Sequence, residues 1–176
     1  MGIAVKKFFN WVLVLAGCVG AFYGIGLIVP RSQTLGSRTS LQAKPDEIYK
    51  VVSDPSTWSQ WHPDVSSIQE RPDRDRHKIW LVTDKEARTF ELEVTAEEEP
   101  TAWQVTYTVD GTRTVLRFDF SWHGSGGRAR VAKTSDTRDT WQRAQRFLLP
   151  TKEASAIALL NALAEYLGEP GSAEEN

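Results

Sequence analysis

Three segments of this chain alternate apolar and polar residues without a break, and they constrain the fold more than any other feature. They are FELEVTA at 90–96, WQVTYTV at 103–109 and LRFDFSW at 116–122. Successive side chains of a strand point to opposite faces, so each segment predicts a strand with one buried and one solvated face. Sheets of such strands are antiparallel. Asp110-Gly111, between the second and third segments, predicts a tight hairpin because a type I′ turn needs positive φ at both central residues.

The other elements follow from weaker patterns on either side. Segments 34–42, 64–70, 76–84 and 128–137 add strands, which gives one sheet of about seven strands. The run PDEIYKVVSD, which starts at Pro45, predicts a helix with proline in its first turn. The run TKEASAIALLNALAEYLG predicts a C-terminal helix, with Thr151 as N-cap, an apolar stripe on one side and Gly168 at its end.

The stretch SDPSTWSQWHP at 53–63 combines prolines with tryptophans. Asp54 is placed to cap a short helix that Pro55 begins and Pro63 ends. Trp58 and Trp61, three residues apart, share one face of that helix. We interpret the pair as a structural plug at one end of the sheet, with direct ligand contact as the alternative.

The N-terminal segment differs from the rest of the chain in its long uncharged, apolar stretch. From Phe8 to Val29 the chain has no formally charged residue. A helix of that length rises about 33 Å at ~1.5 Å per residue, close to the thickness of a bilayer's hydrocarbon core. Residues 1–30 therefore predict a single-pass anchor in the cell membrane. The lysines of the short N-terminal tail favour that tail inside and the domain outside the cytoplasm.

Two alternatives and one extension apply to this segment. The run LAGC at 15–18 resembles a lipobox, in which Cys18 would be acylated, and a cleaved secretory signal is the other alternative. Ala16, Gly20 and Gly24 recur every four residues, a spacing that lets two such helices approach closely and form a homodimer.

The composition indicates no catalytic or cofactor chemistry. The net charge is −2, which lacks the positive footprint of a nucleic-acid binder. Cys18 is the single cysteine, so no disulfide forms within the chain. The histidines, His62, His77 and His123, lack metal-ligand spacing, and no phosphate loop or nucleophile elbow is present. We expect no metal, no cofactor and no catalytic residue.

The run SRTSLQAKPDEIYKVVSDPSTWSQWHPDV at 37–65 carries a family resemblance. It is similar to the polyketide cyclase and lipid-transport group of the START and Bet v 1-like superfamily, over about residues 34–168. The resemblance implies an α+β helix-grip fold: a curved antiparallel sheet around a long C-terminal helix, with an apolar cavity between them. A preceding helix that ends in IVPRSQT resembles the membrane-anchored bacterial members. One departure is Pro150, which indicates a break in the C-terminal helical region. The expected organisation is an anchor at 1–30, a ligand-binding domain at 31–168 and a disordered tail at 169–176.

The predicted ligand site consists of inward-facing apolar residues. They are Phe90, Trp103, Tyr107, Phe118, Phe120 and Trp122 on the strands, and Ile157, Leu160 and Ala164 on the C-terminal helix. Small helix residues opposite a concave sheet leave room for a hydrophobic small molecule or lipid. The alternative is that these side chains fill the space. The predicted function is a membrane-tethered binding module; the alternatives are a cyclase or aromatase, with Tyr107 as its one buried polar group, and an interaction domain with a filled core.

A basic stretch near the C-terminus has two interpretations. Its cations are Arg138, Arg143, Arg146 and Lys152, and its large apolar residues are Trp141, Phe147 and Leu148. Such a segment can lie on an anionic membrane surface. The alternative is a partly covered helix with exposed arginines.

Overall fold

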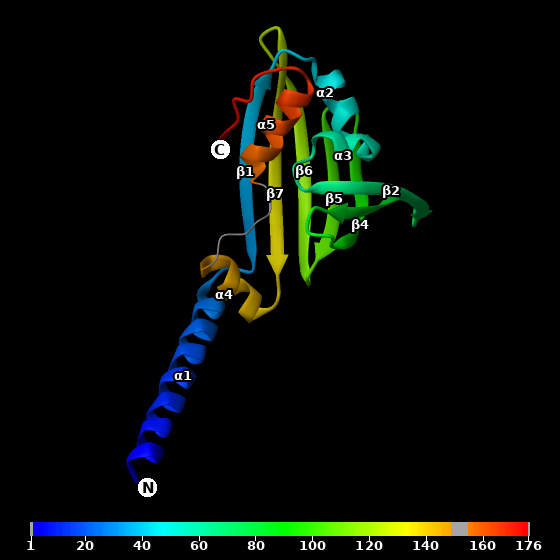
Figure 1. The fold of residues 1–176 in the computed structure, drawn as a ribbon. Helices are drawn as coiled ribbons and strands as arrows, with labels where there is room; N and C mark the ends of the chain where they lie inside the picture. Colours follow the sequence, from blue (N-terminus) through cyan, green and yellow to red (C-terminus); the bar gives the residue numbers. More distant parts are fainter. Residues whose placement is uncertain (1, 149–154, 176) are drawn as a thin grey trace. The chain divides into compact units, whose positions relative to one another are not determined.

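A computed structural model of the chain describes residues 2–148 and 155–175. The chain divides into two compact units, Met1–Ser32 with Thr137–Lys152, and Gln33–Asp136 with Glu153–Asn176. The first unit contains helices α1 (Gly2–Ile28) and α4 (Thr140–Leu148). The second contains the sheet and the remaining helices (Figure 1). The basic stretch predicted within the ligand-binding domain thus groups with the N-terminal helix.

The sheet unit confirms the predicted α+β architecture. Its curved sheet has the strand order β2-β3-β4-β5-β6-β7-β1-β8. The strands are β1 (Ser32–Leu41), β2 (Val65–Arg74), β3 (His77–Asp84), β4 (Thr89–Glu98), β5 (Ala102–Val109), β6 (Thr112–His123), β7 (Gly126–Thr137) and β8 (Glu174–Glu175). Consecutive strands from β2 to β6 pair antiparallel. The β5–β6 hairpin turns at Asp110 and Gly111, whose φ values of 49° and 74° confirm the predicted turn.

Helix α2 (Pro45–Val52), the 3-10 turn η1 (Pro55–Thr57) and α3 (Trp58–Trp61) form the predicted plug. The Asp54 carboxylate accepts a hydrogen bond from the Ser56 N–H at 3.0 Å and so caps η1. The Trp58 indole is buried and donates to the Val52 carbonyl oxygen at 3.0 Å. Trp58 and Trp61 both belong to the core cluster, which supports the structural interpretation of this stretch.

Helix α5 (Ala156–Tyr166) is the described part of the predicted C-terminal helix. The Ser155 hydroxyl caps it by accepting from the Ala158 N–H at 3.1 Å, whereas the predicted cap, Thr151, lies outside the described residues. Beyond its end, Gly168 has a φ of 78°, as a helix C-terminal stop requires.

The C-terminal tail is packed against the sheet, in contrast to the disordered segment expected from its composition. The Glu169 carboxylate accepts hydrogen bonds from the backbone N–H groups of Gln42 and Ala43, at 2.7 and 2.9 Å. Strand β8 then pairs antiparallel with β1. A charged, glycine-containing terminal segment suggested disorder. This one instead provides the Glu169 carboxylate as an acceptor for two backbone N–H groups, and it provides strand β8.

The first unit holds one helical segment, Trp11–Ile28, that is long and apolar enough to cross a membrane or to serve as a signal sequence. Only 6% of this segment is buried. Large side chains such as Trp11, Leu15 and Ile28 are mostly exposed on α1. Exposed apolar surface of this extent is unusual in a soluble domain and marks α1 as a candidate span or signal sequence.

Candidate ligand-binding face

The packed end of the sheet's inner face is a group of side chains almost wholly removed from solvent. We use this name for Trp103, Phe118, Phe120, Leu160 and Ala164, whose exposed fractions are 0, 0, 5, 0 and 0%. Trp103 and Phe118 are cross-strand partners with ring centroids 6.2 Å apart. Five of the nine predicted ligand contacts thus lie in a continuous hydrophobic core.

The plug closes this end of the face. The ring of Trp58 meets that of Trp103 edge to face, with centroids 5.5 Å apart. The ring of Tyr49, on α2, packs edge to face on the ring of Phe120, on β6, with centroids 5.8 Å apart. Both contacts come from the helices that precede β2. The packed end is therefore covered by aromatic rings from outside the sheet.

The open end of the face is less buried. We use this name for Trp80, Phe90 and Tyr107, which are half-buried and pack against the core. The rings of Phe90 and Tyr107 stack with centroids 5.1 Å apart and an interplanar angle of 29°. The strand register places Trp80, Leu92, Tyr107 and Thr114 in one row across four strands. Side chains of such a row share a face, so the open end is a continuous surface.

Polar groups enter the face in this row. The Thr114 hydroxyl lies 3.3 Å from that of Ser135 on β7. The Trp80 Nε1 is buried and has no hydrogen-bond acceptor among the described residues, and the same holds for Trp103 Nε1. A buried donor without an acceptor costs about 1–3 kcal/mol. An oxygen atom of a bound molecule or of water would satisfy the Trp80 indole.

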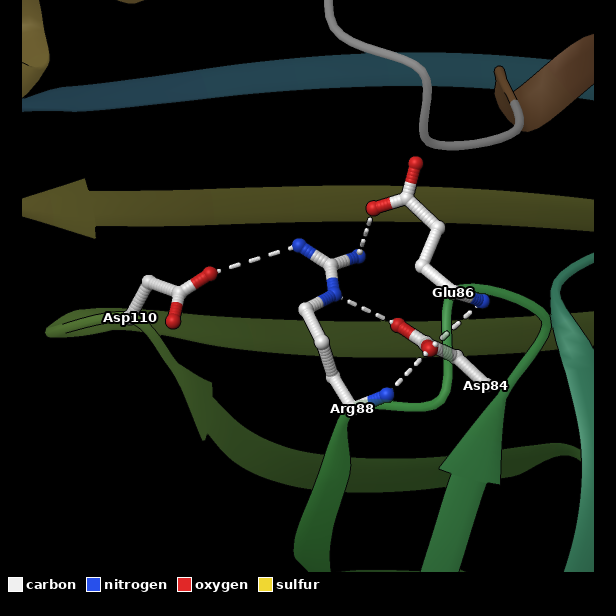
Figure 2. A network of polar contacts seen from close by, with 4 residues as sticks. All are labelled: Asp84, Glu86, Arg88 and Asp110. Atoms are coloured by element: carbon white, nitrogen blue, oxygen red, sulfur yellow. Dashed lines mark hydrogen bonds and ion pairs between the residues drawn. The ribbon is translucent and has the colours of Figure 1, made fainter.

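A charged network lies at the turn before Phe90 and the turn after Tyr107 (Figure 2). Arg88 Nε donates to Asp84 Oδ2 at 2.7 Å, and its Nη1 lies 3.3 Å from Asp110 Oδ2. Its Nη2 lies 3.5 Å from Glu86 Oε2. Arg88 thereby joins the β3–β4 turn to the β5–β6 turn. This fixes the two turns that flank Phe90 and Tyr107 along the chain.

The same contacts set the ionisation of the network. Burial would raise the pKa of the Asp84 carboxyl, but the Arg88 backbone and guanidinium N–H groups lower it overall. For Arg88, burial acts to lower the pKa, whereas Asp84 and the neighbouring carboxylates raise it overall. Both groups therefore stay charged at neutral pH.

His62, which ends α3, is a neutral structural residue. Its ring stacks on Trp58 with centroids 5.0 Å apart, and its Nδ1 accepts from the Asp64 N–H at 3.2 Å. Burial, followed by the charges of Lys133 and Lys85, lowers its pKa to about 3. An imidazole with that pKa is uncharged at neutral pH and is a weak base, so it is poorly suited to acid–base catalysis.

The other histidines also have structural contacts. His77 Nδ1 lies 2.8 Å from the Val94 carbonyl oxygen, and Arg128 lies 2.8 Å from His123 Nδ1. Within the described parts of the chain, no group of three or more His, Cys, Asp or Glu side chains is placed to hold a metal ion.

Of the remaining predicted contacts, Ile157 is half-buried on α5, and Trp122, near the end of β6, is exposed. At 64% exposure Trp122 does not belong to the packed end, and its role as a ligand contact stays a prediction. Alternation along β6 predicted that the Trp122 side chain would be buried. Tyr49 packs on Phe120, however, and Trp122 lies two residues farther along the strand. Sequence reasoning also missed Trp80 and Thr114. Apolar–polar alternation could not mark them, because KIWLV is apolar at consecutive positions and Thr114 is itself polar.

The chain matches one family model, described as polyketide cyclase / dehydrase and lipid transport, over residues 33–158. No curated protein sequence matches the chain.

Several solved structures share the fold. The di-domain ARO/CYC protein BexL, from the BE-7585A biosynthetic pathway, is 15% identical with a TM-score of 0.53. The alignment covers 67% of this chain and 44% of BexL, so this chain spans less than half of that protein. The Zhui aromatase/cyclase from Streptomyces sp. R1128 is 14% identical, with 75% and 91% coverage and a TM-score of 0.59. Protein MLL2253 from Mesorhizobium loti is 15% identical, with 77% and 97% coverage and a TM-score of 0.57. At these identities the likeness concerns the fold.

Proposed function

Because this chain belongs to the polyketide cyclase/dehydrase and lipid transport family, we propose that it is a membrane-tethered module that binds a hydrophobic small molecule or lipid. The ligand lies at the open end of the inner face of the sheet. One observation carries the proposal: the stacked, half-buried pair Phe90 and Tyr107 continues the hydrophobic core out to a polar rim. Apolar walls with a few polar groups are typical of ligand pockets.

The ligand contacts the open end rather than the packed end. Trp103, Phe118, Leu160 and Ala164 have no exposed surface to offer. Trp80, Phe90 and Tyr107 do, and the Trp80 indole N–H lacks an acceptor among the described residues. The favoured ligand therefore has an apolar body that packs against these rings.

Binding is favoured over cyclase chemistry. An acid–base enzyme needs a titratable group with a perturbed pKa positioned in its pocket. The one histidine with a strongly shifted pKa, His62, is stacked on Trp58 and held by the Asp64 N–H. Tyr107 is the remaining candidate acid, and its ring stacks on Phe90 as a wall residue.

Helix α1 supplies the tether, as a retained single-pass anchor with the domain outside the cytoplasm. Trp11–Ile28 meets the length and hydropathy of a span and is almost entirely unburied. An anchor keeps the binding face near lipid-soluble ligands and raises their effective concentration. Retention of the full chain in membranes washed with alkaline carbonate tests the anchor, and the N-terminal sequence of the mature protein distinguishes it from a cleaved signal or an acylated Cys18.

A second copy of α1 is a further proposed partner. A Cβ atom added at Gly20 or Gly24 would meet no other atom within 4 Å. The stripe that these glycines form with Ala16 is thus open to a close helix–helix approach. Disulfide crosslinking in membranes of a Cys18→Ser, Leu27→Cys variant tests this dimer, because Leu27 follows Gly24 by three residues on the same face, whereas Cys18 lies on the opposite side of the helix.

The binding proposal is tested by native mass spectrometry of the full chain released from detergent. We expect a co-purified molecule to add its mass to the wild type. In Phe90→Glu a carboxylate beside the ligand should reduce that occupancy about tenfold or more. Trp122→Glu is the matched control, because it replaces an aromatic ring by the same charge at a position that is 64% exposed and outside the open end.

Two results would count against the binding proposal. Absence of any bound mass in the wild type would leave an interaction domain with a filled core. An adduct of equal occupancy in wild type and Phe90→Glu would place the molecule elsewhere, for example along α1.

A further inference from the structure

We propose that helix α4 lies at the level of the lipid headgroups beside the anchor and forms a second, interfacial contact with the membrane. This inference rests on the proposed role of α1 as the membrane anchor. Four observations within the unit that holds α1 and α4 support it, namely the depth, the exposed face, the buried arginine and the surrounding charges.

The first observation is the depth at which α4 meets α1. The rings of Trp141 and Phe22 lie 4.2 Å apart, and Trp141 shares an apolar groove with Val19 and Tyr23. Phe22 lies about 9 Å before the Ile28 end of α1, at ~1.5 Å per residue. Interfacial helices bury their apolar face by about 5–10 Å. With the end of α1 at the edge of the hydrocarbon core, the Trp141 ring reaches about 9 Å below that edge, within the depth to which interfacial helices bury their apolar face.

The second observation is the exposed face of α4. Ala144, on the side that packs on α1, is fully buried, and a Cβ at Gly26 would collide with the backbone of Thr140. Large apolar residues three and four positions from Ala144 flank it on the same apolar face of α4. Trp141, Phe147 and Leu148 are 44, 65 and 46% exposed. Among the described residues nothing covers them, and their surface is continuous with that of the exposed apolar helix α1.

The third observation is Arg143, which is buried between the helices. Its Nη1 donates to the Val29 carbonyl oxygen at 3.1 Å, and its Nη2 donates to the Thr140 hydroxyl at 3.0 Å. The last carbonyls of a helix lack intrahelical donors, and lipid offers none. Arg143 thus supplies a donor for the end of α1 where water is scarce.

The fourth observation is the charge beside α4. Arg31 and Arg138 are both exposed, and the Thr137 N–H donates to the Arg31 carbonyl oxygen at 3.0 Å, which brings them close together. Two acids lie near Arg138 in sequence: Asp136, which is exposed, and Asp139, which accepts from the backbone N–H groups of Trp141 and Gln142 and caps α4. Residues 136–148 carry three arginines against these two acids, and Arg31 adds a further cation, so the net charge is positive, which suits lipid phosphates and anionic headgroups.

The test uses the full chain reconstituted in vesicles of phosphatidylcholine and phosphatidylglycerol. Cys18 is the single cysteine, so an environment-sensitive NBD dye can be attached at one site at a time. Three labelled proteins are compared: wild type at Cys18, Cys18→Ser with Phe147→Cys, and Cys18→Ser with Trp122→Cys. Lipids with a doxyl quencher high or low on the acyl chain report the depth of each dye.

We expect the dye at position 147 to shift its emission to the blue and to be quenched most by the shallow doxyl group. The dye at Cys18 should be quenched most by the deep group, and that at position 122 should be quenched by neither. A water-exposed dye at 147 with a quenched Cys18 would overturn the role of α4 and leave the anchor intact. An unquenched Cys18 would overturn both proposals. Shallow quenching at both 147 and 122 would indicate that the whole domain contacts lipid and would overturn the specific role of α4.

Discussion

The two ends of the sheet's inner face are built from similar residues and differ in what covers them. The packed end presents Trp103 and Phe118, and the open end presents Trp80, Phe90 and Tyr107. At the packed end, beside α5 and the plug, every side chain is 5% exposed or less. At the open end the same kind of ring remains half-buried, beside the Arg88 network. An aromatic residue on the inner face therefore does not by itself mark a ligand contact; its cover decides whether it stabilises the fold or stays available for binding.

The largest effect is expected from truncation at the packed end. Leu160→Ala removes a fully buried side chain and should lower the free energy of unfolding by about 2–5 kcal/mol. Ile157→Ala, on the same helix but half-buried, should cost clearly less because part of that side chain is already in water. Thermal and denaturant unfolding of both variants measures the difference. Equal costs would mean that burial does not separate the two positions.

Overpacking gives the next largest effect. Ala164 has no exposed surface, so Ala164→Trp should destabilise the fold by about 1–3 kcal/mol. Ala162→Trp is the matched control, since Ala162 is half-buried on the same helix and has room for the ring. The midpoint of thermal unfolding checks both.

The opposite result would break the comparison. If Ala164→Trp left the thermal midpoint unchanged and also removed the bound molecule, the packed end would contain the cavity. The ligand would then lie between Trp103 and α5, as the sequence-based prediction had it.

The sequence predicted the sheet well because alternation depends on local geometry. The segments around Leu92, Val105 and Phe118 became β4, β5 and β6, and Asp110-Gly111 became their hairpin turn. Which of the inner-face side chains are buried by other elements was harder to predict, because those elements are distant in sequence. Nothing local distinguishes Phe120, on which Tyr49 packs, from Trp122, which is exposed. The Glu169 contacts with the β1–α2 loop were invisible for the same reason.

A smaller effect is expected at the rim of the open end. The pKa of Asp84 is lowered in the folded chain, so its charged form adds stability above the ordinary carboxyl pKa of about 3.9. That contribution is lost as the pH falls through the lowered native value. Asp84→Asn should cost about 1 kcal/mol at neutral pH and flatten the loss of stability in acid. Asp110→Asn is the control: its side chain is 72% exposed, so the change should be smaller. Identical acid profiles for wild type and Asp84→Asn would show that the network does not hold the turns.

The smallest effect on stability, and the most informative about function, is expected from the stacked pair at the open end. Phe90→Leu and Tyr107→Leu keep an apolar side chain, and a double-mutant cycle isolates the ring–ring contact at about 0.5–1 kcal/mol. The matched cycle at the packed end uses Phe118 and Phe120, whose ring centroids are 6.3 Å apart. Each single substitution there should lower the free energy of unfolding more than its equivalent at the open end does. If the open end is a binding surface, the pair variants unfold nearly as the wild type does and yet lose the bound molecule. If Tyr107→Leu cost as much as Leu160→Ala, Tyr107 would be a core residue, and the open end would offer no site.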